Sequence, residues 1–321
     1  MGFLGMGNYN KPGPGVSKDD PQKIAPVRFF EIFLRKFWKL VQVNLLFAIP
    51  MTIAMVLFWF LINMFEVQAS PMFTLNPAMY IALIPMIFVS PFVAGLTMIT
   101  RNFTREEHAF IWTDFIKAVK SNFKLFMLNG VICYAAFTIL SVAIQYYNYQ
   151  SASNGFFYVP LALCVMLSVL FLFAQYYMPT VLITFDLKYR QALKNSFLLG
   201  VLGMGRNFLL TIGLAALLVG LFVISGHPLA FFVVLVLLVF IVYAFWSFLV
   251  NFATYPIIKK YMITPQFESE EDKEKAKDGE NSEKEASLSF WEELTEEEDD
   301  DSYVYVNGRM MKRSELKENN E

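Results

Sequence analysis

The sequence predicts an all-α membrane protein with six transmembrane helices. Hydrophobic residues make up 56% of the 321 positions and charged residues only 17%, which is fewer charges than soluble domains usually carry. The mean hydropathy is +0.46. Six separate apolar runs each reach the length of about 20 residues that a helix needs to cross a bilayer. A soluble core cannot enclose this much apolar surface, so we expect an integral membrane protein.

The six apolar runs must be helical within lipid, because every backbone polar group there needs an internal partner. They cover Leu40–Phe65, Ala78–Ile99, Leu125–Tyr147, Tyr158–Phe185, Asn207–Ser225 and Leu229–Tyr255. The last two are separated only by Gly226-His227-Pro228. Since proline and glycine break helices, we interpret these two runs as a hairpin.

The distribution of lysine and arginine predicts the orientation of the spans. The connections Glu66–Pro77, Asn148–Phe157 and Gly226–Pro228 contain no Lys or Arg, so all 26 lie in the other connections and the two terminal regions. Positively charged loops remain on the cytoplasmic side of a membrane. We therefore expect both termini to be cytoplasmic.

Basic amphipathic segments precede the odd-numbered spans and suggest interfacial helices. They are Val27–Lys39, Arg105–Lys124 and the stretch around Tyr189–Phe197. Because the six residues from Ala118 resemble the six from Ala192, one interpretation is three repeats of an interfacial helix followed by a hairpin. The alternative is that any inner loop before a span looks basic and amphipathic.

The chain divides into three regions. Residues 1–39 form a cytoplasmic segment with an interfacial helix, residues 40–258 form the six-helix domain, and residues 259–321 form a tail. Residues 261–321 hold 20 acidic and 8 basic side chains, a composition typical of disorder over Phe267–Ser287. Near its end, alternating β-forming residues flank Asn307-Gly308, which predicts a β-hairpin. An isolated hairpin is marginally stable, so we expect it to dock on the basic inner face or on a partner.

Ionisable side chains are almost absent from the expected spans. No Asp, Glu, Lys, Arg or His lies inside them, and the acidic residues Glu66 and Asp186 stand at their edges. Proteins accept buried charge where protons, ions or charged solutes move, so the pattern argues against a pump, a voltage sensor or a carrier of charged solutes. Uncharged polar residues remain within the spans. Gln175, Ser247 and Asn251 are candidates to line a path for a neutral solute, or else they form hydrogen bonds between helices.

The segment Arg105-Glu-Glu-His108 with Asp114 is the only cluster that resembles an acid–base or metal site. A metal needs three or four convergent ligands, which this segment alone does not supply. We therefore expect no catalytic residue, metal or cofactor, and a charged interfacial helix explains the cluster best. A membrane-bound lipid enzyme remains the alternative if Glu107, His108 and Asp114 face other polar groups.

Contacts with lipid or partners are expected at two places on the inner side. The first is the interfacial helix with Trp112, Phe115, Lys117 and Lys120, and the second is the tail hairpin at Asn307 and Gly308. Anionic lipid of the inner leaflet is the natural counter-charge for these basic residues. Nucleic acid is not an expected partner, because the basic residues lie at the membrane.

Several motifs resemble the YesL-like family of Gram-positive bacterial membrane proteins, a domain of unknown function. They include the segments Asn10–Pro21, Phe29–Lys39 and Val93–Leu96 and, most specifically, Arg101–Phe115. Where family members often carry a Gly-Pro-Ala-Thr-Ala-Gly-like run, Ser90–Gly95 keeps the Pro and the Ala-Gly. The resemblance implies a multi-pass protein of the bacterial plasma membrane, often encoded beside sugar-uptake transporters.

Two functions follow as expectations. The first is a non-enzymatic accessory or scaffold protein that associates with transporter or sensor subunits of a carbohydrate system, as the resemblance implies. The second is a transporter of a neutral or lipid-like solute, for which the proline-containing spans and the polar residues within them would form the path.

Overall fold

The computed structural model confirms the predicted fold class. It describes residues 24–65, 77–226, 228–265, 303–306 and 309–312. Within these ranges, six helical segments are long and apolar enough to cross a membrane, namely Ala25–Met64, Pro77–Thr104, Ile111–Ser151, Gly155–Thr184, Met204–Ser225 and Ala230–Ile263. The protein is therefore an all-α, multi-pass membrane protein.

Two of the expected interfacial helices are continuous with the spans that follow them. Helix α1 runs without interruption over Ala25–Met64, and α4 runs over Ile111–Ser151. No glycine or proline separates the amphipathic part of either helix from its apolar part, so nothing breaks the backbone hydrogen bonding there. The third amphipathic segment is a separate helix, α6 (Tyr189–Leu202), which ends at Gly203 before α7 (Met204–Ser225) begins.

The second span is built from three short pieces. Helix α2 (Pro77–Ala82) leads into the 3₁₀ turn η1 (Ile84–Val89), and α3 (Ser90–Thr104) follows. Pro85 and Pro91 both stand at the start of a piece, where a missing N–H costs no helical hydrogen bond. This segmentation shapes one wall of the cavity described below.

The fourth and sixth spans also contain irregular turns. The short turn η2 (Gly155–Phe157) precedes α5 (Tyr158–Thr184). The sixth span consists of α8 (Pro228–Leu237), the π-turn η3 (Leu238–Val242), α9 (Tyr243–Ile258) and a second π-turn, η4 (Lys259–Ile263).

Asn44 of α1 supplies partners for the backbone of η3. Its side-chain amide donates to the carbonyls of Leu238 at 2.8 Å and Val239 at 2.6 Å, and its Oδ1 accepts from the N–H of Ala244 at 2.8 Å. Asn44 is fully buried. A π-turn disturbs the regular helical pairing, so this one side chain satisfies backbone groups that have no water to bond.

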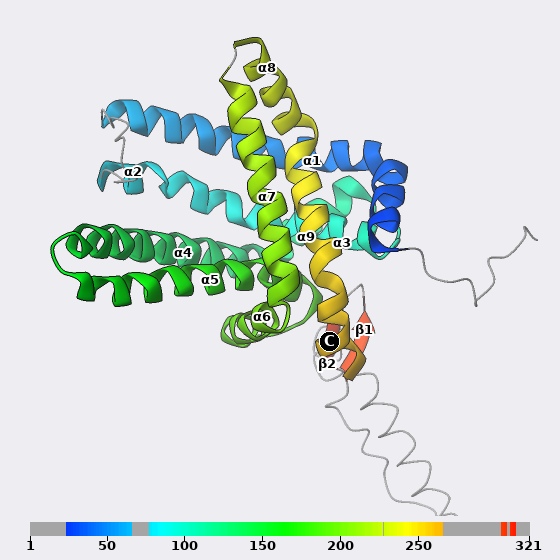
Figure 1. Ribbon diagram of the computed structural model, residues 1–321. Helices are drawn as coiled ribbons and strands as arrows, with labels where there is room; N and C mark the ends of the chain where they lie inside the picture. Colours follow the sequence, from blue (N-terminus) through cyan, green and yellow to red (C-terminus); the bar gives the residue numbers. More distant parts are fainter. Residues whose placement is uncertain (1–23, 66–76, 227, 266–302, 307–308, 313–321) are drawn as a thin grey trace, which may run out of the picture.

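The helices radiate from a common centre (Figure 1). Helix α3 lies in the middle and packs against α4 and α9. The α4/α5 hairpin and the α7/α8 hairpin extend from this centre in different directions. Phe29, Phe33 and Phe248 form part of an aromatic cluster where α1 meets α9. The ends of the spans that carry the basic segments therefore converge, whereas the two hairpins separate toward their tips.

A two-stranded antiparallel sheet docks beside α5. Strand β1 (Tyr303–Val306) pairs with β2 (Arg309–Lys312) in the register Tyr303 to Lys312. Met310 is 2% exposed and packs into the core with Phe185, and its carbonyl accepts the N–H of Asp186 at 3.3 Å. Of the two docking sites expected for the hairpin, the structure shows the one on its own chain. Asn307, Gly308 and the stretch Phe267–Ser287 lie outside the described residues.

Candidate functional site: a polar cluster at a membrane cavity

A cavity of about 530 Å³ lies among η1, α3, α4 and α5. Met51 of α1, which follows Pro50, also contributes to its wall. Gly130 lets α4 approach the junction of η1 and α3 closely, since a Cβ there would lie 2.7 Å from the Cβ of Ser90 and 3.1 Å from the carbonyl oxygen of Ile87. The lining is mostly apolar. It consists of Met51, Leu83, Met86, Ile87, Val89, Ser90, Val93, Phe126, Asn129, Gly130, Cys133, Tyr134, Phe137, Gln175 and Pro179.

Three polar side chains form a relay at one end of this cavity. The hydroxyl of Tyr189, on α6, donates to Oδ1 of Asn129 on α4 at 2.9 Å. The amide of Asn129 then donates to Oε1 of Gln175 on α5 at 3.2 Å. Burial raises the pKa of the Tyr189 phenol, so the hydroxyl keeps its proton at neutral pH and remains a donor.

The relay ends in an unpaired group. The amide nitrogen of Gln175 is buried and has no hydrogen-bond partner among the described residues. Exchanging the oxygen and nitrogen of both amides, which are interchangeable in shape, would leave the oxygen of Gln175 unpaired instead. In either arrangement one polar atom of Gln175 lacks a partner, and such an atom is costly in an apolar medium.

Pro179 removes a second hydrogen bond from the same residue. It stands inside α5 four positions after Gln175 and also lines the cavity. Proline has no N–H, so it cannot give the Gln175 carbonyl its usual helical hydrogen bond. Pro179 therefore interrupts the regular backbone hydrogen bonding of α5 beside Gln175, at the wall of the cavity.

Ser247 and Asn251, the other two candidate lining residues, lie elsewhere. Thr180 donates to Oδ1 of Asn251 at 2.6 Å, and the Asn251 amide donates to Oγ1 of Thr100 at 2.8 Å. The hydroxyls of Thr100 and Ser247 are also 2.8 Å apart. This closed network joins α3, α5 and α9, so these two residues bond helices together, as the alternative interpretation of the sequence had it.

The expected inner contact surface is only partly exposed. Trp112 is 63% exposed and lies between two grooves of about 660 and 640 Å³. Lys117 and Lys120 line the second groove. Phe115, in contrast, is 4% exposed and packs on Gly95, where an added Cβ would lie 2.6 Å from its ring. Phe115 is therefore a core residue and not part of that surface.

The three acidic side chains after α3 each bind a different partner. Glu106, whose φ of 61° is in the left-handed region, pairs with Arg28 at 3.2 Å and with Arg35 of α1. Glu107 pairs with Arg105 at 2.6 Å. Asp114 accepts the backbone N–H of Phe110 at 2.8 Å. Among the described residues no group of three His, Cys, Asp or Glu side chains is placed to hold a metal.

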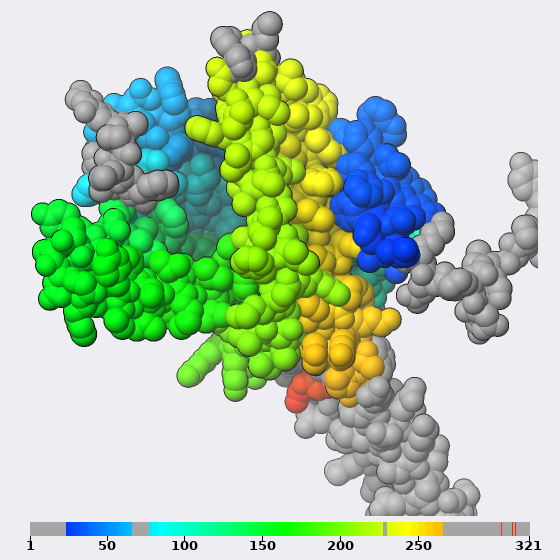
Figure 2. Space-filling view, viewed as in Figure 1, coloured from blue at the N-terminus to red at the C-terminus, as the bar shows by residue number. Residues whose placement is uncertain are grey.

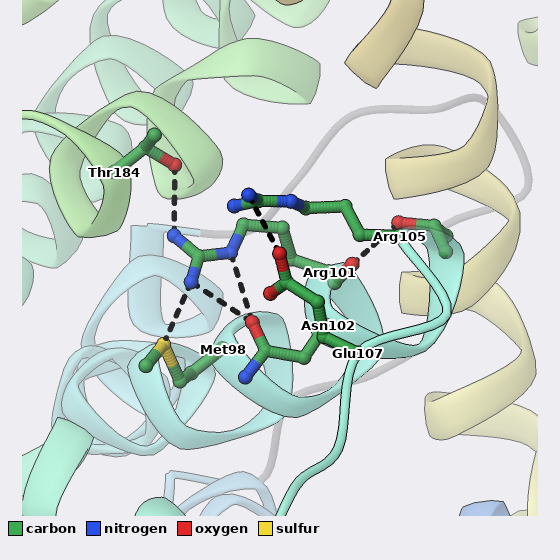
Figure 3. Close-up of polar contacts among 7 residues, drawn as sticks. Met98, Arg101, Asn102, Arg105, Glu107 and Thr184 are labelled. Atoms are coloured by element: carbon green, nitrogen blue, oxygen red, sulfur yellow. Dashed lines mark hydrogen bonds and ion pairs between the residues drawn. The ribbon is translucent and has the colours of Figure 1, made fainter. Parts of the chain in front are cut away.

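Among the described residues, one basic side chain from a predicted connection between spans is buried. Arg101 belongs to α3 and is fully buried. It donates to Oγ1 of Thr184 at 3.0 Å, to Oδ1 of Asn102 at 2.9 Å and to the sulfur of Met98 (Figure 3). It thereby ties the end of α3 to the end of α5, directly beside the residue on which Met310 docks.

The comparisons with known proteins identify part of the chain. Residues 40–144 match the family described as "Protein of unknown function, DUF624". This is the family of the YesL-like bacterial membrane proteins, so residues 40–144 are similar to them. The resemblance that the sequence motifs indicated is thus confirmed over about a third of the chain. The search of curated proteins and the search of solved structures found no match.

The YesL-like segment contains one side of the candidate site. Asn129 and Gly130 of the cavity lie within it, as does buried Arg101. Gln175 and Tyr189, which complete the polar relay, lie beyond its end.

Proposed function

We propose that this protein is a non-enzymatic accessory or scaffold protein of the bacterial plasma membrane, with both termini in the cytoplasm. Its partners would be the transporter or sensor subunits of a carbohydrate system. The observation that carries the proposal is an exposed face of small residues on α7.

Gly213, Ala216 and Gly220 of α7 share one helical face by their spacing. Gly213 and Ala216 are exposed and Gly220 is half-buried. A Cβ added at Gly213 or Gly220 would meet no atom within 4 Å. Small residues in membrane helices let a second helix approach closely. Nothing among the described residues uses that space, and α7 runs along the near surface in Figure 2, so we assign the face to a partner helix.

The inner surface around Trp112 supports the same role. Exposed tryptophan flanked by grooves is typical of the residues that dominate binding energy in interfaces. Lys117 and Lys120 beside it also suit the anionic headgroups of the inner leaflet. The link to carbohydrate uptake depends on the YesL-like family resemblance, and the cytoplasmic orientation depends on the distribution of Lys and Arg.

The test is affinity purification from native membranes in mild detergent, followed by mass spectrometry. We expect the wild-type chain to recover transporter or sensor subunits in stoichiometric amounts. Gly213→Leu should lose them, because it fills the small-residue face. The matched control is Ala215→Leu, which adds the same side chain at an exposed position on a different face of α7. Equal recovery by both variants would contradict the proposed interface.

A second candidate function is the transport of a neutral or lipid-like solute. The cavity at Gln175 favours it, because broken helices beside a polar group build solute sites in many transporters. Its wall is mainly apolar, which favours a lipid-like molecule over a sugar. Uptake of such a solute by vesicles containing only this protein would support transport and would remove the need for a partner.

A further inference from the structure

We propose that the cavity among η1, α3, α4 and α5 binds a neutral lipid that carries a free hydroxyl group. The inference does not depend on the accessory role, and it specifies the ligand class for the second candidate function.

The lining contains no charged side chain. None of the residues around the cavity is Asp, Glu, Lys, Arg or His. A charged headgroup placed there would lose its hydration without gaining a counter-charge, which is costly inside a membrane. The wall therefore selects a neutral molecule, and the apolar majority of its surface selects a hydrocarbon chain.

Most polar atoms at the wall already have partners. The hydroxyl of Ser90 donates to the carbonyl of Phe126 at 2.7 Å, and the hydroxyl of Tyr134 donates to the carbonyl of Tyr80 at 2.9 Å. The amide of Gln175 is the exception, since one of its atoms remains unpaired in either orientation. The ligand group that binds at this end should therefore complete the relay from Tyr189 through Asn129.

A hydroxyl is the group that fits this end in every case. It donates and accepts, so it satisfies Gln175 whether the unpaired atom is the amide nitrogen or the amide oxygen. An ether or ester oxygen accepts only, so it would satisfy Gln175 only when the unpaired atom is the amide nitrogen.

The placement of the relay indicates how the lipid lies. Asn129 is near the basic end of the apolar stretch of α4, and Phe137 lies eight residues, or about two turns, deeper. The hydroxyl would bind near Gln175, and the hydrocarbon chain would extend toward Phe137 and Leu83. A volume of about 530 Å³ falls within the range of small-molecule sites. A lipid could enter from the leaflet that faces the basic segments.

The first experiment uses the full-length wild-type protein in phosphatidylcholine nanodiscs. A photoreactive diacylglycerol is bound and cross-linked, and mass spectrometry locates the labelled peptide. We expect labelling within residues 126–137 or 175–179. Unlabelled diacylglycerol should then compete about three- to tenfold better than its methyl ether. The two lipids differ by one hydrogen bond, and one hydrogen bond within a membrane changes an affinity by about that factor. Equal competition by the two lipids, or labelling elsewhere, would overturn the proposal.

A second arm assigns the hydroxyl to its partner. Gln175→Leu should weaken diacylglycerol binding by the same factor and abolish the preference over the methyl ether. The control Gln150→Leu makes the identical change at a half-buried glutamine whose side chain bonds Tyr146, and we expect it to behave like wild type. A preference that survives Gln175→Leu in folded protein would refute the site. Recovery of partner subunits, measured on the same variants, should not change in either case. If Gln175→Leu does not fold, the wild-type competition decides.

Discussion

Replacing Asn44 with leucine should destabilise the protein strongly, although leucine is more apolar. The buried amide makes three hydrogen bonds to the backbone of the sixth span, at 2.6 to 2.8 Å. Hydrogen bonds between membrane helices contribute roughly 0.6–2 kcal/mol each. Three of them give about 2–6 kcal/mol, and the packing of leucine should return part of it. We therefore expect a loss of about 2–4 kcal/mol in the free energy of unfolding.

The assay is unfolding of the purified protein in mixed micelles by titration with dodecyl sulfate. Asn63→Leu is the matched control on the same helix, because Asn63 is exposed and its amide bonds only Trp59 within α1. It should change the free energy of unfolding by less than about 0.5 kcal/mol. Hydrogen exchange at the Ala244 amide should also accelerate in Asn44→Leu alone. Equal stability of the two variants would refute the idea that Asn44 supports the π-turn.

Three further outcomes are expected. Gly95→Ala should lower the free energy of unfolding by about 1–3 kcal/mol, because the added methyl group would overpack against the Phe115 ring. Gly213→Ala should leave the free energy of unfolding of the monomer unchanged. The hydrogen bond from Arg35, followed by its charge and the contact with Arg28, lowers the pKa of Glu106. This stabilisation is present above the usual carboxyl pKa and is lost as pH falls through the lowered value. Hydrogen exchange at the start of α1 should therefore accelerate in acid, and Glu106→Gln should show the faster exchange already at neutral pH. Met310→Asp should undock the hairpin and expose residues 303–312 to protease, while unfolding of the bundle remains cooperative.

The spans could be predicted closely because membrane crossing depends on local composition. The apolar run predicted at Tyr158–Phe185 corresponds to α5, Tyr158–Thr184, and the run predicted at Asn207–Ser225 is the apolar part of α7. Gln175 could also be predicted as a polar residue inside the bundle, because a polar side chain in an apolar run must face another helix.

Side-chain partners depend on packing and could not be predicted in the same way. Arg101 appeared to belong to a basic loop because charge ends an apolar run, and its burial depends on Thr184, which lies far along the chain. Phe115 lies on the apolar side of an amphipathic segment, and only the close approach of Gly95 shows that it is covered. Ser247 and Gln175 look alike in sequence, yet Gln175 lines the cavity beside α4 whereas Ser247 bonds Thr100 on another helix.

The docked hairpin has a consequence for competition with other molecules. Met310 binds a site on the chain to which it is covalently joined, so the hairpin and its site meet at a fixed effective concentration, on the order of millimolar for covalently linked binding partners. A soluble peptide with the sequence of the hairpin would need a comparable concentration to displace it. Cutting the chain between Ile263 and Tyr303 would remove that advantage, and the hairpin would then dissociate from its site and diffuse into solution. Proteolysis would therefore uncover the junction of α5 and α6 far more effectively than a competing ligand.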